Sequence, residues 1–208
     1  MSVLVFGVRL TLEIRPDFVV VRLDLKNAHN EVKRASMVRR TAAAEHLGGL
    51  VPLLWATCCP KSDIHLPIDG ALEKADFASE EGAQQGDGLA SAGFCVTIHP
   101  EVCQLDAELG PHGGAARFDM DDGYAMGPPH VVLPAVVRFA QSLLPLGLEL
   151  HVTRCECFCP NGGLENHPDR PAHMLLGGME ASDGTFGFGV PVGGIPVGDS
   201  VYITAYMD

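Results

Sequence analysis

Three aspartates in two distant segments have the residue type and setting to hold divalent metal ions. Asp24 ends a β-branched run that begins at residue 17, which predicts a strand closing on a carboxylate. Asp121 and Asp122 precede Gly123, and Asp-Gly favours a hairpin turn because glycine adopts a positive φ. Carboxylates brought together repel one another unless a cation lies between them. Two Mg²⁺ ions would relieve that repulsion and support nucleotidyl transfer, since Mg²⁺ is shared between carboxylates and substrate phosphates.

A glutamine-glycine segment lies between the two acidic sites. Residues 79–89 read Ser-Glu-Glu-Gly-Ala-Gln-Gln-Gly-Asp-Gly-Leu, and the mostly apolar stretch 89–98 predicts a helix that Asp87 can cap. Taken singly, a polar turn at 121–123 and a plain glycine loop here would have the same patterns. The interpretation as a metal site for nucleotidyl transfer therefore depends on the order of the segments along the chain and not on any one pattern.

The remaining patterns indicate the elements that must position these residues. Helical spacing of apolar residues predicts helices, alternation and β-branched residues predict strands, and turn-forming residues predict a loop. No repeat or domain boundary is evident, so residues 1–208 are expected to form a single domain. The expected helices cover 27–47, 50–56, 89–98 and 130–146; the expected strands cover 17–24, 148–152, 154–159 and 185–193, with a short hairpin within 60–78 and a loop at 160–184.

The composition limits the class of protein. With 47% hydrophobic and 19% charged residues, the chain is expected to fold rather than remain disordered. The formal net charge of −12 argues against a chain that binds nucleic acid unaided, because phosphate neutralisation needs Lys and Arg. Seven cysteines follow no secretory disulfide spacing, and no run reaches about 18 apolar residues. We therefore expect an intracellular protein, in the nucleus or cytoplasm, that is not secreted and does not enter a membrane.

Taken in order, these segments resemble the palm region of reverse transcriptases, most closely those of non-LTR retrotransposons. The first motif is Leu-Asp-Leu-Lys-Asn-Ala-His-Asn at 23–30, and the second, at 79–89, is similar to Gly-x-Gln-Gln-Gly-Asp-Pro-Leu. Residues 118–127 resemble Tyr-x-Asp-Asp followed by Gly-Tyr and Gly-Pro. A fourth motif at 147–156 resembles Gly-Leu-x-Leu-Asn-x-x-Lys-Cys-Glu, and a segment similar to Leu-Gly-Val-Pro-Ile-Gly follows at 187–193. The resemblance covers about residues 17–195. The four motifs in this order form a specific pattern when they are taken together.

The resemblance implies an α+β fold, with a polymerase palm-like antiparallel sheet and helices packed on one face. It implies RNA-directed DNA polymerase activity, in which two Mg²⁺ ions assist nucleotidyl transfer onto a primer 3′-hydroxyl. The implied partners are an RNA template, a DNA primer and a deoxynucleoside triphosphate (dNTP), and the implied parent is a longer polyprotein. The implied catalytic residues and metal ligands are Asp24, Asp121 and Asp122, and the implied nucleotide-binding residues are His29, Gln85, Gly86 and Arg154.

Four positions depart from the family pattern. His29 replaces Phe or Tyr, Gly88 replaces Pro, Asp119 replaces an aromatic residue and Arg154 replaces Lys. Asp119 adds a negative charge that should raise the pKa of neighbouring carboxyls, and arginine cannot donate a proton near neutral pH. The family's basic fingers region and its thumb have no counterpart here, in keeping with the charge of −12. We therefore do not expect polymerase activity from this chain alone.

Two further interpretations stay open. A zinc-binding interaction module is one, since three cysteines alternate on one expected strand, although Cys-x-Cys-x-Cys lacks the usual spacing of zinc ligands. Buried cysteines are also ordinary core residues. The other is a non-catalytic remnant of a retroelement, which the four departures favour. The zinc ligands would be Cys155, Cys157 and Cys159, with His151 and either His167 or His173.

Overall fold

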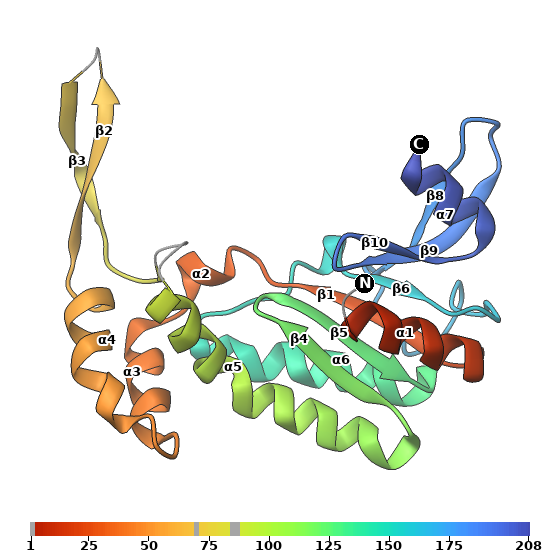
Figure 1. Ribbon diagram of the computed structural model, residues 1–208, viewed down its shortest axis with the longest axis horizontal. Coiled ribbons are helices and arrows are strands. Elements are labelled where there is room, and N and C mark those ends of the chain that lie inside the picture. Colours follow the sequence, from red (N-terminus) through yellow and green to blue (C-terminus); the bar gives the residue numbers. More distant parts are fainter. Residues whose placement is uncertain (1–2, 69–70, 84–87) are drawn as a thin grey trace. The chain divides into compact units, whose positions relative to one another are not determined.

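The computed structural model describes residues 3–68, 71–83 and 88–208, and these residues have an α+β fold (Figure 1). Contacts between residues divide the chain into two compact units. The first unit comprises Met1–Leu25, Glu101–Leu143 and Glu149–Asp208, and the second comprises Lys26–Pro100 and Leu144–Leu148.

A five-stranded sheet in the order β4-β5-β1-β6-β7 forms the centre of the first unit. The strand β1 (Val19–Asp24) lies between β5 (Asp122–Gly127) and β6 (Glu156–Phe158) and is antiparallel to both. At the edges, β4 (Ala115–Asp119) pairs antiparallel with β5, and β7 (Leu175–Leu176) pairs parallel with β6. The valine-rich sequence of β1 explains its central place, because a strand buried on both faces needs apolar residues on both.

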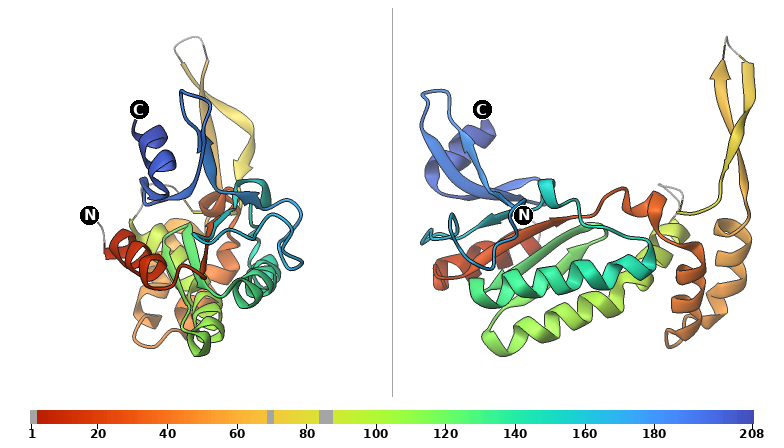
Figure 2. Two further views of the ribbon diagram at one scale, coloured as in Figure 1. Left: turned by 90° about the vertical axis from the view of Figure 1, so that its right-hand side faces the viewer. Right: turned by 180° about the vertical axis from the view of Figure 1, so that it is seen from behind.

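Helices cover one face of this sheet (Figure 2). The helix α6 (Pro129–Leu143) buries six side chains, and its Phe139 ring packs 5.4 Å from the Phe118 ring of β4, measured between centroids. The last part of α5 (Gly88–Leu109) runs beside it and buries Leu105 and Leu109. The predicted α+β fold is confirmed, and the strand pairs of this sheet are antiparallel except for β6–β7.

The opposite face of the sheet packs against α1 (Val3–Ile14) and a second, three-stranded sheet in the order β10-β9-β8. That sheet contains β8 (Gly178–Glu180), β9 (Phe186–Val192) and β10 (Ile195–Gly198), and α7 (Ser200–Met207) packs on it. The buried apolar cluster that joins these parts consists of Val5, Val8, Leu12, Phe18, Val20, Tyr124, Met126, Phe158, Val190, Val192 and Val197.

The second unit contains short helices and a long two-stranded hairpin. The helix expected over 27–47 is interrupted at Val32 and Lys33, where the backbone bonds to other segments: the carbonyl of Val32 accepts from the N–H of Gly82 at 3.0 Å, and the N–H of Lys33 donates to Leu146 at 2.9 Å. The elements are α2 (Ala28–Glu31), α3 (Arg34–Ala43), α4 (Val51–Cys58), β2 (Ser62–Ile68), β3 (Ala71–Ser79) and the start of α5.

Two other expectations differ from the structure. Residues 148–152 do not form a strand; Leu150 makes one isolated bridge to Leu25, and a short 3₁₀ turn follows at Val152–Arg154. The segment 160–184 is irregular as predicted up to residue 174 and then contains β7 and β8. The remaining 3₁₀ turns are Gly48–Leu50, Gly110–His112 and Leu144–Leu146.

The stretch Pro129–Leu146 is long and apolar enough to cross a membrane by length and composition alone. Within the structure, its buried side chains include Val132, Leu133 and Phe139, and Phe139 contacts the sheet. The core helix of a folded domain has the same composition, because it too must bury an apolar face.

Arg34 holds the base of the β2–β3 hairpin against α3. The side chain of Arg34 is buried. The backbone N–H of Arg34 donates to the Glu81 carboxylate at 2.8 Å. The guanidinium donates to the Ser79 hydroxyl at 2.8 Å and to the carbonyls of Gly82 at 2.9 Å, Pro60 at 3.0 Å, Ser79 at 3.2 Å and Glu81 at 3.2 Å. This basic residue of the expected helix is therefore a structural one and not part of a solvated face.

We predict that Arg34→Lys lowers the free energy of unfolding by about 2–4 kcal/mol, because an ammonium group cannot replace the several bonds of the planar guanidinium. Thermal and urea denaturation would measure the loss. The matched control is Arg39→Lys on the exposed side of the same helix, which should change stability by less than about 0.5 kcal/mol. Equal effects of the two changes would contradict the structural role of Arg34.

Candidate functional site

The β4–β5 hairpin turns at Met120 and Asp121. Asp119 pairs with Asp122, so only two residues form the turn. Met120 has a φ of 55°, which non-glycine residues seldom adopt. The turn therefore presents Asp121 half-buried at its tip, directly before Asp122 in β5.

The prediction that Gly123 supplies the positive φ of this turn is wrong. Gly123 lies inside β5, opposite Phe118 of β4. A Cβ atom at this position would lie 2.3 Å from the Phe118 ring. The glycine is needed for that close packing, and Met120 takes the left-handed conformation instead.

The pairing of β1 with β5 places Asp24 directly opposite Asp122. Opposite residues of antiparallel strands share a face of the sheet, with Cα atoms about 4.5–5.5 Å apart. Asp121 and Asp119 adjoin this pair, so four carboxylates gather at one end of the sheet. We call Asp24, Asp119, Asp121 and Asp122 the acidic cluster.

Bonds to the segment before β6 fix the backbone of Asp24. The β1–β6 ladder ends at the pair Arg22 and Glu156, two residues before Asp24. Beyond it, the N–H of Asp24 donates to the Cys155 Sγ at 3.5 Å, and its carbonyl accepts from the N–H of His151 at 2.8 Å. Asp24 is thereby held at the strand end even where regular pairing has stopped.

The charges around Asp122 do not balance. Burial raises the pKa of Asp122 above its ordinary value, and the negative charges of Asp121, Asp24 and Asp119 raise it further. Arg22 opposes this rise, with its guanidinium 3.9 Å from the Asp122 Oδ1. Since the pKa is raised overall, one arginine does not offset the burial and the repulsion, and an added cation would favour the ionised form.

Within the acidic cluster, the predicted metal ligands Asp24, Asp121 and Asp122 form a donor set that fits Mg²⁺. It offers only carboxylate oxygens, which a hard cation prefers. Within residues 3–68, 71–83 and 88–208, no three Asp, Glu, His or Cys side chains converge as a metal site made of protein alone requires. Mg²⁺ does not need such a site, because it commonly binds through one or two carboxylates together with waters and substrate phosphates.

The predicted nucleotide-binding residues lie in different places. His29 belongs to the second unit and is buried there, with its ring centroid 4.8 Å from that of Phe94. The Nδ1 of His29 has no hydrogen-bond partner among the described residues. Arg154 is exposed in the first unit and directly precedes Cys155, which contacts Asp24. Gln85 and Gly86 fall outside the described residues.

The three cysteines of the zinc interpretation are buried, and each is near a different backbone oxygen. The Sγ atoms lie 3.9 Å from Asp24 O for Cys155, 3.4 Å from Leu175 O for Cys157 and 3.6 Å from Pro16 O for Cys159. Burial raises the pKa of all three thiols, that of Cys157 to about 11, whereas zinc binds thiolates. The described residues thus give the zinc interpretation no support.

Comparison with solved structures identifies similar folds. A telomerase from Candida tropicalis, truncated from its C-terminal domain, superposes with a TM-score of 0.58 over 79% of this chain at 11% identity. A telomerase from Candida albicans, solved with a fragment of telomeric RNA, superposes with a TM-score of 0.57 over 88% of this chain at 11% identity. The chain spans 36% and 34% of these telomerase chains. No protein-family model and no curated protein matches the sequence.

The chain shares the fold of part of these telomerase chains, which is reverse-transcriptase-like. Telomerase catalytic subunits share this fold, and the agreement is one of backbone arrangement, since identity is about a tenth. The predicted resemblance is therefore confirmed at the level of the fold.

Sequence reasoning missed two residues of this reverse-transcriptase-like fold that contact the acidic cluster. Arg22 shares the sheet face of Asp24 because side chains alternate along a strand, so its spacing of two residues was a usable signal. Cys155 was considered as a motif residue, a zinc ligand or a core cysteine, and not as a partner of Asp24, yet its Sγ accepts the N–H of Asp24. No local pattern indicates that contact, since the two residues are 131 positions apart.

We predict that Asp122→Asn raises the melting temperature at pH 7. A carboxyl whose folded pKa is raised destabilises the fold once it ionises, and this penalty grows as the pH rises from about 3.8, the unfolded value, through the raised folded pKa. The gain from Asp122→Asn should therefore shrink as the pH falls toward about 3.8. Calorimetry over this pH range would measure it, and a lower melting temperature for Asp122→Asn at pH 7 would contradict the electrostatic account.

Proposed function

We propose that this chain is the palm region of a reverse transcriptase of the non-LTR retrotransposon type. In this role it adds deoxynucleotides to a primer 3′-hydroxyl on an RNA template. The observation that carries the proposal is the β1–β5 register, which puts Asp24 opposite Asp122 within a reverse-transcriptase-like fold. The motifs that resemble this family supply both aspartates.

Asp24 and Asp121 would hold two Mg²⁺ ions, with Asp122 supporting the ions or the primer end. When bound, the ions supply positive charge to the attacking and leaving oxygens of nucleotidyl transfer. The backbone bonds of Asp24 to Cys155 and His151 keep its carboxylate in position for this role. The raised pKa of Asp122 adds support, because such a group gains from a nearby cation.

His29, Gln85, Gly86 and Arg154 would bind the incoming nucleotide. The Nδ1 of His29 has no hydrogen-bond partner among the described residues, which supports a polar role for this ring, since buried nitrogen atoms are normally hydrogen-bonded. In the family the equivalent ring screens the sugar 2′ position, and we assign this role to His29. Arg154 is exposed and bears a permanent positive charge, which suits contact with a phosphate.

The nucleic-acid partners would be an RNA template and a DNA primer. Solved telomerases with this fold include complexes with a fragment of telomeric RNA, which supports an RNA partner. The net charge of −12 is unsuited to gripping two phosphate backbones unaided. We therefore propose that the chain works within a longer polyprotein, whose other parts supply the basic surface.

Primer extension on an RNA template with Mg²⁺ tests this proposal, with each substitution made in the longer polyprotein that contains this chain. Asp121→Asn should reduce extension by at least about a hundredfold, because it removes a metal ligand from the centre of charge stabilisation. The matched control is Asp119→Asn, which makes the same chemical change at an exposed carboxylate of the same hairpin and should keep extension within about threefold. Extension that persists in Asp121→Asn, or is lost equally in both variants, would contradict the two-metal assignment.

A further inference from the structure

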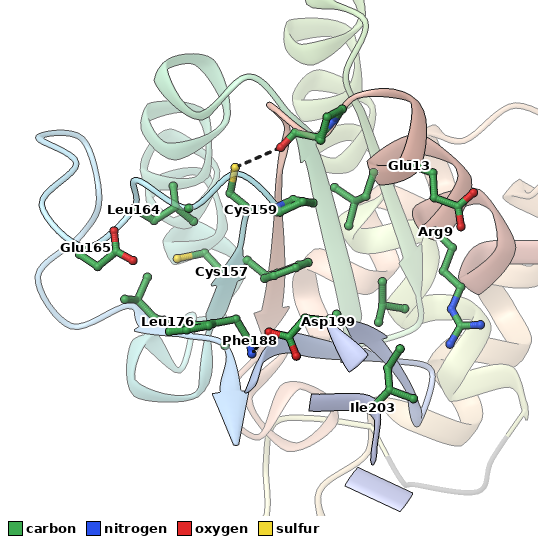
Figure 3. A pocket seen from close by; sticks show the side chains of 18 residues that line it. Arg9, Glu13, Cys157, Cys159, Leu164, Glu165, Leu176, Phe188, Asp199 and Ile203 are labelled. Atoms are coloured by element: carbon green, nitrogen blue, oxygen red, sulfur yellow. Dashed lines mark hydrogen bonds between the residues drawn. The ribbon is translucent and has the colours of Figure 1, made fainter. Parts of the chain in front are cut away.

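A cavity of about 590 Å³ opens in the first unit, between α1, β6 and the β10–α7 corner. Figure 3 shows Cys157, Cys159, Leu164 and Glu165 on one side and Arg9 and Glu13 of α1 on the other. Small-molecule sites in proteins have volumes of about 300–1,000 Å³, so this one is large enough for an organic ligand. Its lining includes no member of the acidic cluster, which makes it a separate site.

The walls of this cavity are apolar. Two of its polar side chains, Cys157 and Cys159, have their thiols against the carbonyls of Leu175 and Pro16 and are buried and uncharged. They therefore act as apolar surface toward a ligand. The hydrophobic side chains that complete the walls include Leu12, Phe158, Leu164, Leu176, Val197 and Ile203.

The mouth of the cavity is acidic. Glu13 and Glu165 are exposed there, and in the part of the chain that the structure describes neither carboxylate forms an ion pair or a side-chain hydrogen bond. A third carboxylate, Asp199, accepts the N–H groups of Phe188 and Tyr202 at 2.8 Å. The guanidinium of Arg9, which lines the same cavity, donates to the Pro196 carbonyl at 2.7 Å. The lining thus carries three anionic groups and one cation, and Arg170, outside the lining, donates from its guanidinium to the carbonyls of Leu164 and Glu165.

We propose that this cavity binds an organic cation with an apolar, aromatic-sized body. The body would lie against the apolar walls, and the ammonium group would lie at the mouth beside one of the two exposed glutamates, Glu165 or Glu13. Charge complementarity selects this class of ligand, because an anion would be repelled by three carboxylates and a neutral molecule would lack the attraction between opposite charges. Burial of an apolar body supplies affinity, and the carboxylates supply specificity.

Calorimetric titration of the full chain with three biphenyl probes tests the proposal. The probes share one apolar body and carry an aminomethyl, a hydroxymethyl or a carboxylate group. The aminomethyl cation should bind about fivefold more tightly than the neutral probe, as expected for an ion pair at an exposed mouth, and the carboxylate should bind most weakly. Glu165→Gln together with Glu13→Gln should remove the preference for the cation and leave the affinity for the neutral probe unchanged.

A cavity-filling substitution locates the site. Ile203→Trp on α7 should abolish binding of all three probes, whereas Thr204→Trp, on an exposed position of the same helix that does not line the cavity, should leave binding intact. If Ile203→Trp fails to fold, the double variant Glu165→Gln with Glu13→Gln still tests the preference for the cation. Both glutamates are exposed, so we expect this variant to fold. Absence of binding, equal affinity for the cation and the carboxylate, or binding that survives in a folded Ile203→Trp variant would each overturn the proposal.

Discussion

The pairing of β1 with β5 is the constraint on which the rest of this structure depends. Six consecutive residue pairs, from Val19 opposite Gly127 to Asp24 opposite Asp122, fix the register of the two strands. A slip of one residue would turn Asp24 toward the opposite face and bury a carboxylate among apolar side chains. The valines of β1 therefore do more than form a core: their burial determines where the carboxylates meet.

The proximity of the Asp24 and Asp122 carboxylates is electrostatically unfavourable, and contacts with the surrounding structure maintain it. The backbone of Asp24 donates to the Cys155 Sγ and accepts from the N–H of His151, and the left-handed conformation of Met120 turns the hairpin so that Asp122 begins β5. Concentrated like charge and an unusual backbone conformation are costs that ordinary turns avoid. Such costs are common at functional sites, because a ligand can offset them there.

Much of this architecture is predictable from the sequence, and the exceptions have physical causes. The strand ending at Asp24 and the helix beginning near residue 130 follow from local patterns that tertiary packing reinforces. The turn at Met120 does not, because packing of Phe118 against Gly123 decides the register of the hairpin. The break at Val32 likewise depends on Gly82, fifty positions away, and the Cys155 contact joins residues even more distant in the chain. Long-range contacts of this kind leave no local pattern.

Binding of Mn²⁺, followed by electron paramagnetic resonance, shows whether these carboxylates hold a metal ion, since Mn²⁺ prefers the same oxygen ligands as Mg²⁺ and needs no substrate turnover to be detected. We predict that the wild-type chain binds Mn²⁺ and that Asp24→Asn weakens binding by at least about tenfold. The matched control is Asp119→Asn, which makes the same chemical change at an exposed carboxylate of the β4–β5 hairpin. This variant should bind Mn²⁺ with nearly the affinity of the wild type. Equal Mn²⁺ affinity in the wild type and in Asp24→Asn would contradict a metal site formed by the β1–β5 pairing.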